Sequence, residues 1–287
     1  MKVLVLGGTR FFGKRLVHLL IEEGHEVTIL SRGNQKDDFG NKVSRFIADR
    51  KDKKAMKKVI GDNLFDAVID QICMTAEDAR DSIEIFRNKT PYYLMTSTMS
   101  VYSQKGNLKE EDFNPLTYKP QVANDLGEQY AEGKRAAEKV FMTEAPFVCS
   151  FARFPVVLGE DDYTRRLYDQ VKRVQNDRSI YYPNIHAKFS FIQSMDAARA
   201  LRWLLHTKSS GPYNFAAEDP VVLRDLISKI ESLAQKKAHL LSVPDEEAYS
   251  PFGIGSDWYL NVEKAKKEGF ECIRTSQWLD QLIMKLL

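Results

Sequence analysis

The chain has 287 residues, of which 29% are charged, and its formal net charge is +2. A balance so near neutrality argues against a partner recognised mainly as a polyanion. The start of the chain shows neither a signal segment nor a long apolar span, so the sequence predicts a cytoplasmic protein with no membrane partner. The three cysteines lack metal-ligand spacing and indicate reduced thiols.

The first predicted element is a strand over residues 2–6, where aliphatic residues follow one another. It leads directly into a glycine-rich turn and then into an amphipathic helix. In this setting a turn can bind a dinucleotide pyrophosphate, because glycines permit a tight turn and the helix N-terminus offers unpaired N–H groups. The residues expected to contact the cofactor here are Gly7, Thr9, Arg10, Phe11, Phe12 and Gly13.

Predicted strands and helices then alternate along the first half of the chain. Short apolar runs predict strands over residues 25–30, 46–48, 65–70, 92–96 and 147–152, and amphipathic runs predict helices over residues 51–60 and 75–86. Such alternation implies right-handed crossovers and a parallel sheet with helices on both faces. We therefore predict an α/β protein with a Rossmann-type, doubly wound parallel sheet and a smaller C-terminal α/β substrate domain.

The domain boundary is expected near residue 154, because the alternation loosens beyond residue 153. Residues 1–154 form the predicted nucleotide-binding domain, and the chain returns to it near residues 189–207. Residues 155–287 are expected to form mainly the substrate-binding domain.

Tyr130 and Lys134 are four residues apart and would share one face of a helix. An ammonium group beside a phenol favours the phenolate. That group can take a proton from a substrate hydroxyl, or give one to a carbonyl, while hydride moves to or from a nicotinamide. A hydroxyl is also needed to hold the substrate oxygen, and the Thr/Ser cluster at residues 96–100 offers candidates.

With these motifs in place, the chain resembles the extended short-chain dehydrogenase/reductase family, of the NAD(P)-dependent epimerase/dehydratase type. The resemblance runs almost end to end, through residues 7–13, 96–102, 130–134, 153–159, 191–196, 213–215 and 261–270.

The resemblance assigns roles to single residues. It implies that Tyr130 and Lys134 are the catalytic pair and that Lys134 also bonds the nicotinamide ribose. It places the substrate-holding hydroxyl on Thr98, with Ser97 second. It puts Asp49 against the adenine, the alternative being that Asp49 caps the next helix.

Two departures from the family pattern concern the cofactor. Ser31 and Arg32 follow the second strand where NAD-preferring relatives carry Asp or Glu. A small polar residue and an arginine accommodate a ribose 2′-phosphate, so we predict NADP rather than NAD. Arg10 replaces the middle glycine of the turn, and either adds a guanidinium contact to a phosphate or spoils the turn for binding.

Substrate contacts are expected from Tyr102, Arg165 and Arg166. The arginines would hold a phosphate of a nucleotide sugar, unless they are solvated charges at a helix start. Met99 follows Thr98 where the resemblance implies an acidic residue in a 4,6-dehydratase, so epimerisation and carbonyl reduction stay open.

The resemblance also implies a homodimer formed through the helix that carries Tyr130. Apolar surface for that contact is expected from Ala137, Val140 and Phe141.

Two rival functions stay open. The Gly-Gly-Thr-Arg-Phe turn resembles a subgroup that includes plastid stem-loop RNA-binding proteins, and the basic run at residues 50–58 fits RNA binding. The low net charge and the Tyr130/Lys134 pair count against RNA. A catalytically silent nucleotide-binding protein is the second rival.

The five histidines lack metal-ligand spacing, so no metal site is predicted.

Overall fold

The computed structural model describes residues 1–123 and 125–287, which divide into two compact units. Unit 1 comprises Met1–Val101, Glu110–Phe154 and Met195–Asn214. Unit 2 comprises Tyr102–Lys109, Pro155–Ser194 and Phe215–Leu287. Each unit therefore draws on segments that are far apart in the chain.

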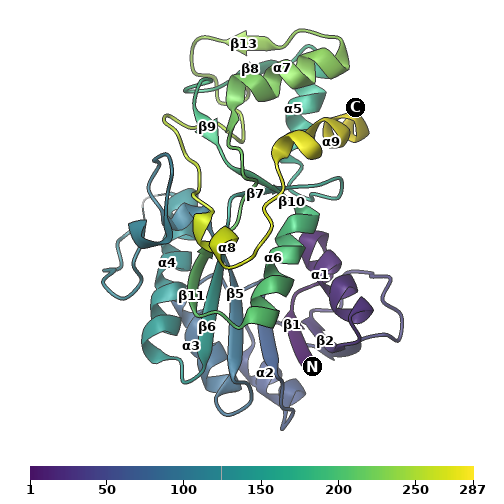
Figure 1. Ribbon diagram of the computed structural model, residues 1–287, viewed down its shortest axis with the longest axis vertical. Helices are drawn as coiled ribbons and strands as arrows, with labels where there is room; N and C mark the ends of the chain where they lie inside the picture. The colour runs from purple at the N-terminus through teal and green to yellow at the C-terminus, as the bar shows by residue number, and fades with distance from the viewer. Residues whose placement is uncertain (124) are drawn as a thin grey trace. The chain divides into compact units, whose positions relative to one another are not determined.

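A parallel sheet forms the centre of unit 1 (Figure 1). Among the described residues, seven strands pair in the order β11-β6-β5-β4-β1-β2-β3. They are β1 (Lys2–Leu6), β2 (Glu26–Ser31), β3 (Ser44–Ile47), β4 (Ala67–Asp70), β5 (Tyr92–Thr98), β6 (Val148–Phe154) and β11 (Gly211–Asn214). The strand order reverses between β1 and β4, which opens a ligand crevice at the carboxyl ends of the strands. The predicted Rossmann-type, doubly wound sheet is confirmed.

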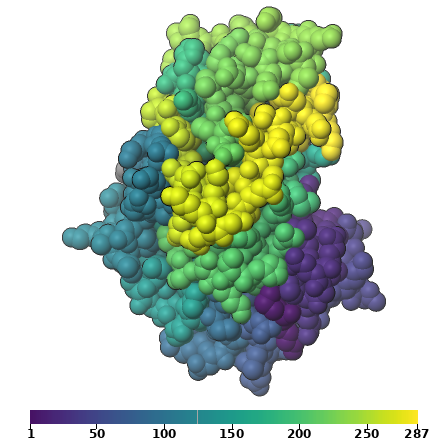
Figure 2. Space-filling view, viewed as in Figure 1, coloured from purple at the N-terminus to yellow at the C-terminus, as the bar shows by residue number. Residues whose placement is uncertain are grey.

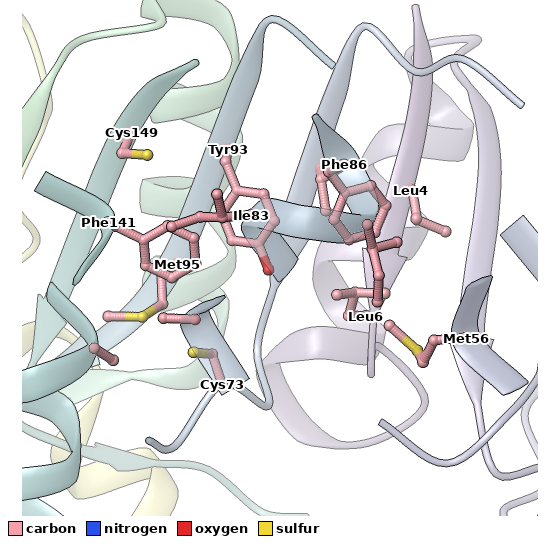
Figure 3. Packing of buried hydrophobic residues seen from close by; sticks show 14 of the residues in the cluster. Leu4, Leu6, Met56, Cys73, Ile83, Phe86, Tyr93, Met95, Phe141 and Cys149 are labelled. Atoms are coloured by element: carbon pink, nitrogen blue, oxygen red, sulfur yellow. The ribbon is translucent and has the colours of Figure 1, made fainter. Parts of the chain in front are cut away.

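Helices cover both faces of this sheet. On one face lie α1 (Phe11–Glu22) and α6 (Ser194–Thr207), and on the other lie α2 (Lys53–Ile60), α3 (Ala76–Phe86) and α4 (Leu126–Glu144). Successive strand residues point to opposite faces of the sheet, so the apolar side chains of one strand pack alternately against the helices on either face. Figure 3 shows the core of the second face, where strand and helix side chains meet: Leu4, Leu6, Tyr93, Met95, Met56, Ile83, Phe86 and Phe141.

Polar residues at the helix starts fix where the helices of this second face begin. Asp52 caps α2 by accepting a hydrogen bond from the Ala55 N–H at 2.9 Å, and Thr75 forms a capping box with Asp78 at the start of α3. The alternative in which Asp49 caps α2 is therefore wrong, because the N-cap position is three residues later, at Asp52.

The apolar surface expected to form a dimer contact is not available. Ala137, Val140 and Phe141 are all buried in the core beneath the sheet. They point inward because they continue the apolar face of α4 that packs on β5 and β6.

Unit 2 consists of short elements. Its strands pair in twos and are β7 (Val156–Leu158), β8 (Ser179–Tyr181), β9 (Lys188–Phe189), β10 (Phe191–Gln193), β12 (Val221–Val222) and β13 (His239–Leu241). Its helices are α5 (Arg166–Gln175), α7 (Leu223–Ala234), α8 (Glu263–Lys267) and α9 (Leu279–Leu286). Helices α5, α7 and α9 pack against one another and bury a core of their own.

None of the helices in the described residues is long and apolar enough to cross a membrane.

Candidate active site

The glycine-rich turn takes the shape that its sequence predicts. Gly7 and Gly8 have φ of 94° and 82°, in the left-handed region that favours glycine. A Cβ on Gly8 would lie 2.9 Å from Val5 and 3.1 Å from Val17, so the turn packs tightly between β1 and α1. Both the backbone shape and the close packing therefore require glycine at this position.

The N-terminus of α1 opens at the same turn. Arg10 is the exposed N-cap residue; its backbone is extended and its side chain does not cap the helix. The first turn carries no acidic residue. The main-chain N–H groups and the positive end of the helix dipole can therefore receive an anionic group such as a pyrophosphate.

Gln71, which follows β4, is a further candidate residue of the cofactor site, and the sequence analysis did not predict it. Its Nε2 is buried and has no hydrogen-bond partner among the described residues. Its side-chain amide fills the space beside Gly13, where a Cβ would overlap it. A buried donor without a partner is costly, and a bound group would satisfy it. The turn, the open helix start and this amide together fit a dinucleotide.

The residues that were predicted to select the cofactor lie at the carboxyl edge of neighbouring strands. Ser31 ends β2, and its Oγ accepts a hydrogen bond from the Gly33 N–H at 3.2 Å. Arg32 follows on the surface. Asp49 is also exposed and follows β3, where its carboxylate accepts from the Lys51 N–H at 2.9 Å.

Helix α4 carries the predicted catalytic pair. Lys134 is buried, and its Nζ donates to the carbonyl oxygens of Cys73 at 2.7 Å and Thr96 at 2.9 Å. Tyr130 lies one turn earlier, 43% exposed, with its ring centroid 5.9 Å from that Nζ. The ammonium is therefore fixed by the backbone of unit 1, whereas the phenol remains open to solvent.

The structure separates the two candidate hydroxyls. Ser97 donates to the buried carboxylate of Glu138 at 2.5 Å, and that carboxylate pairs with buried Arg153. Thr98, at the end of β5, accepts from the Ser100 N–H at 3.1 Å and donates to the Ser100 hydroxyl at 3.3 Å. Ser97 thus belongs to a buried ionic network, while the partners of Thr98 in the described part of the chain are short-range ones that a ligand could replace.

A close backbone approach holds this part of α4 in place. A Cβ on Gly133 would overlap the main-chain oxygen of Met74. Glycine at this position therefore lets the loop after β4 lie directly against the helix. The same loop supplies the Cys73 carbonyl that binds Lys134. No local sequence pattern indicates this contact, because it joins segments about sixty residues apart.

The predicted substrate residues belong to unit 2. Tyr102 is buried. Arg165 and Arg166 line a cleft of about 600 Å³, and the Arg165 guanidinium lies 4.0 Å from the centroid of the Tyr168 ring. Arg178, which was not predicted, lines the same cleft and lies 3.5 Å from Asp169. Arginines can bind a phosphate and aromatic rings can pack against a planar ring, so this cleft suits a ligand that carries both groups.

Two curated relatives from Arabidopsis thaliana match parts of the chain. One, 33% identical over 126 residues, is the chloroplast stem-loop binding protein of 41 kDa b; the match covers 39% of this chain and 33% of that protein. The other, 27% identical over 185 residues, is UDP-arabinose 4-epimerase 1; this match covers 55% of the chain and 43% of that protein. The matches thus span less than half the length of these relatives.

Among solved structures, the UDP-glucose 4-epimerase of Thermus thermophilus in complex with NAD superimposes with a TM-score of 0.74 at 18% identity. The alignment covers 100% of this chain and 99% of that one. At this identity the likeness establishes the fold alone.

The family model for the NAD dependent epimerase/dehydratase family matches residues 3–216. That range contains the glycine turn, the Tyr130/Lys134 pair and, except for Lys2 at the start of β1, the seven strands of the main sheet described for unit 1. The resemblance read from the sequence is thereby confirmed. The chain belongs to the NAD dependent epimerase/dehydratase family.

Proposed function

We propose that the chain is an NADP-dependent epimerase or reductase that acts on a nucleotide sugar, with Tyr130 as its acid/base. The observation that carries this proposal is the exposed Tyr130 phenol beside the anchored Lys134 ammonium. The glycine turn and Gln71 would hold the pyrophosphate, and unit 2 would supply the arginine cleft for a substrate phosphate.

Each residue then has a distinct task. When bound, the nicotinamide supplies hydride transfer. Tyr130 removes or returns the proton of the substrate oxygen, and Thr98 holds that oxygen beside the phenol. Lys134 favours the phenolate while its own position is set by two carbonyls. Arg165 and Arg166 orient the substrate through its phosphates.

The acid/base role is tested with Tyr130→Phe. We expect turnover of UDP-sugars to fall by roughly 100-fold to 10,000-fold, the usual contribution of a general acid/base, with NADP affinity unchanged. Turnover is followed by NMR of the sugar anomers, and affinity by titration calorimetry. Retained turnover in Tyr130→Phe would refute the role.

The preference for NADP is tested with Arg32→Glu. Removing one hydrogen bond to a charged group should weaken NADP binding by about 10-fold to 100-fold, and NAD binding should not weaken. Arg87→Glu, an exposed arginine at the other end of unit 1's strands, is the charge-matched control. A wild-type protein that binds NAD as tightly as NADP would contradict the preference.

RNA binding is a second candidate because the stem-loop binding protein is 33% identical over 126 residues. The basic run at residues 50–58 gives it little support. Arg50 is buried against Asp70 at 2.6 Å, Lys51 pairs with Asp78, and Lys53 pairs with Asp81. RNA binding that weakens steeply with salt would nevertheless establish it.

A further inference from the structure

A cluster of two histidines and a glutamate lies on unit 1, away from the glycine turn. Glu23 is the C-cap residue that follows α1, His25 immediately precedes β2, and His206 lies in the last turn of α6. One ligand atom from each residue lies within 4.8 Å of the others. His25 is at the amino end of the parallel strands, whereas the glycine turn is at their carboxyl end.

The donor atoms converge on a common point. The Glu23 Oε2 lies 3.3 Å from His25 Nε2 and 2.9 Å from His206 Nε2. Zinc bonds of about 2.0–2.1 Å place tetrahedral ligands about 3.3 Å apart, so these donors need shift only slightly to hold an ion. Two imidazoles and one carboxylate form a donor set that suits zinc and its neighbours in the first transition row.

His25 supplies the independent sign that a ligand belongs here. Its side chain is only 10% exposed, and its Nε2 is buried without a hydrogen-bond partner among the described residues. The His25 Nε2 and the Glu23 Oε2 lie 3.3 Å apart, but their geometry does not meet the angles of a hydrogen bond. The main-chain nitrogen of Met1 contacts Nδ1 at 3.2 Å, which leaves Nε2 as the nitrogen facing the cluster.

The surroundings fix the carboxylate without blocking it. Arg202, on α6, contacts the Glu23 Oε1 at 3.3 Å, while Oε2 is the oxygen that faces both histidines. Partners that orient a ligand in this way strengthen metal sites. His206 is 44% exposed, so an ion can enter from solvent. In the space-filling view, purple atoms of the chain start lie against green atoms of the segment that contains α6 (Figure 2).

We propose that Glu23, His25 and His206 form a binding site for a divalent transition-metal ion, with Zn²⁺ as the best fit. The ion takes three protein ligands and completes its coordination with water. It joins the end of α6 to the turn between α1 and β2, and so fastens the returning segment to the first strands. Its effect is on the stability of unit 1.

The test measures metal uptake directly, in protein prepared without a polyhistidine tag and stripped with a chelator. We expect the wild-type chain to bind one equivalent of Co²⁺ with visible d–d absorption bands, and Zn²⁺ to displace it. Zn²⁺ should also raise the unfolding temperature, because it binds only the folded state. His206→Gln and Glu23→Gln should each weaken binding by about tenfold or more.

His18→Gln is the matched control, because His18 is a surface histidine of α1 paired with Asp38 outside the cluster. It should bind the metal like the wild type. Absence of stoichiometric uptake by the wild type would overturn the proposal and leave an ion-pair cluster with Arg202. Equal binding by His206→Gln and wild type would overturn it as well.

Discussion

At the scale of single residues, Lys134 does two things at once. Its buried ammonium ties α4 to the Cys73 and Thr96 carbonyls, and the same charge lies beside the Tyr130 ring. An ammonium has three donors, of which the two carbonyls use two; within residues 1–123 and 125–287 the third has no hydrogen-bond acceptor and could point at a ligand. We therefore propose that Lys134 serves both the fold and the reaction, so its loss should affect stability as well as turnover.

Lys134→Met tests this double role. The substitution leaves two buried carbonyls without their donor, so we expect the free energy of unfolding to fall by roughly 2–3 kcal/mol. Tyr130→Phe, at a side chain 43% exposed, should change it by less than about 0.5 kcal/mol. Urea unfolding of both variants gives the comparison. Equal stability of Lys134→Met and wild type would show that the two hydrogen bonds contribute nothing.

At the scale of elements, the sequence predicted the strands of the main sheet well and their long-range contacts poorly. Residues 2–6 and 92–96 are strongly apolar because parallel strands are covered on both faces, and this makes them easy to recognise. Strand β11 was not predicted as a strand, because Gly211 and Pro212 weaken its local signal and only pairing with β6 makes it one.

The candidate site divides in the same way. Gly7, Tyr130 and Lys134 could be named in advance because their spacing is local and carries a chemical meaning. Gln71 could not, and neither could the His25–His206 pair of the separate cluster, because packing brings them to their partners across long stretches of chain. Local patterns thus indicate which side chains are candidates for the reaction, whereas the tertiary fold decides what surrounds them.

The contact between α4 and the loop after β4 gives a prediction at this scale. Gly133→Ala puts a methyl group against the Met74 carbonyl, so the helix and loop must separate. We expect a loss of about 1–3 kcal/mol in the free energy of unfolding, as for other overpacked sites.

Gly127→Ala is the control on the same helix, because its nearest neighbour is the carboxylate of Asp125 rather than a backbone. That variant should be as stable as the wild type or slightly more stable, since alanine favours helix. If Gly133→Ala were equally benign, the close approach would have no energetic role.

At the scale of the whole molecule, the main sheet is assembled from segments distant in the chain. Strand β11 and most of α6 come from Met195–Asn214, yet they complete unit 1. Tyr92 on β5 donates a hydrogen bond to the Leu204 carbonyl on α6 at 2.9 Å, which fixes the returning helix against the sheet. Unit 1 is therefore built from three separate stretches of the chain.

The interleaving of the two units has a consequence for synthesis. While the ribosome has made only the first 154 residues, β6 is an open sheet edge and the face that α6 covers is bare. The nascent chain must keep that edge from pairing with other chains until about sixty more residues have emerged. Slow translation of residues 155–214 would prolong this exposure, and holdase chaperones would find their binding surface there.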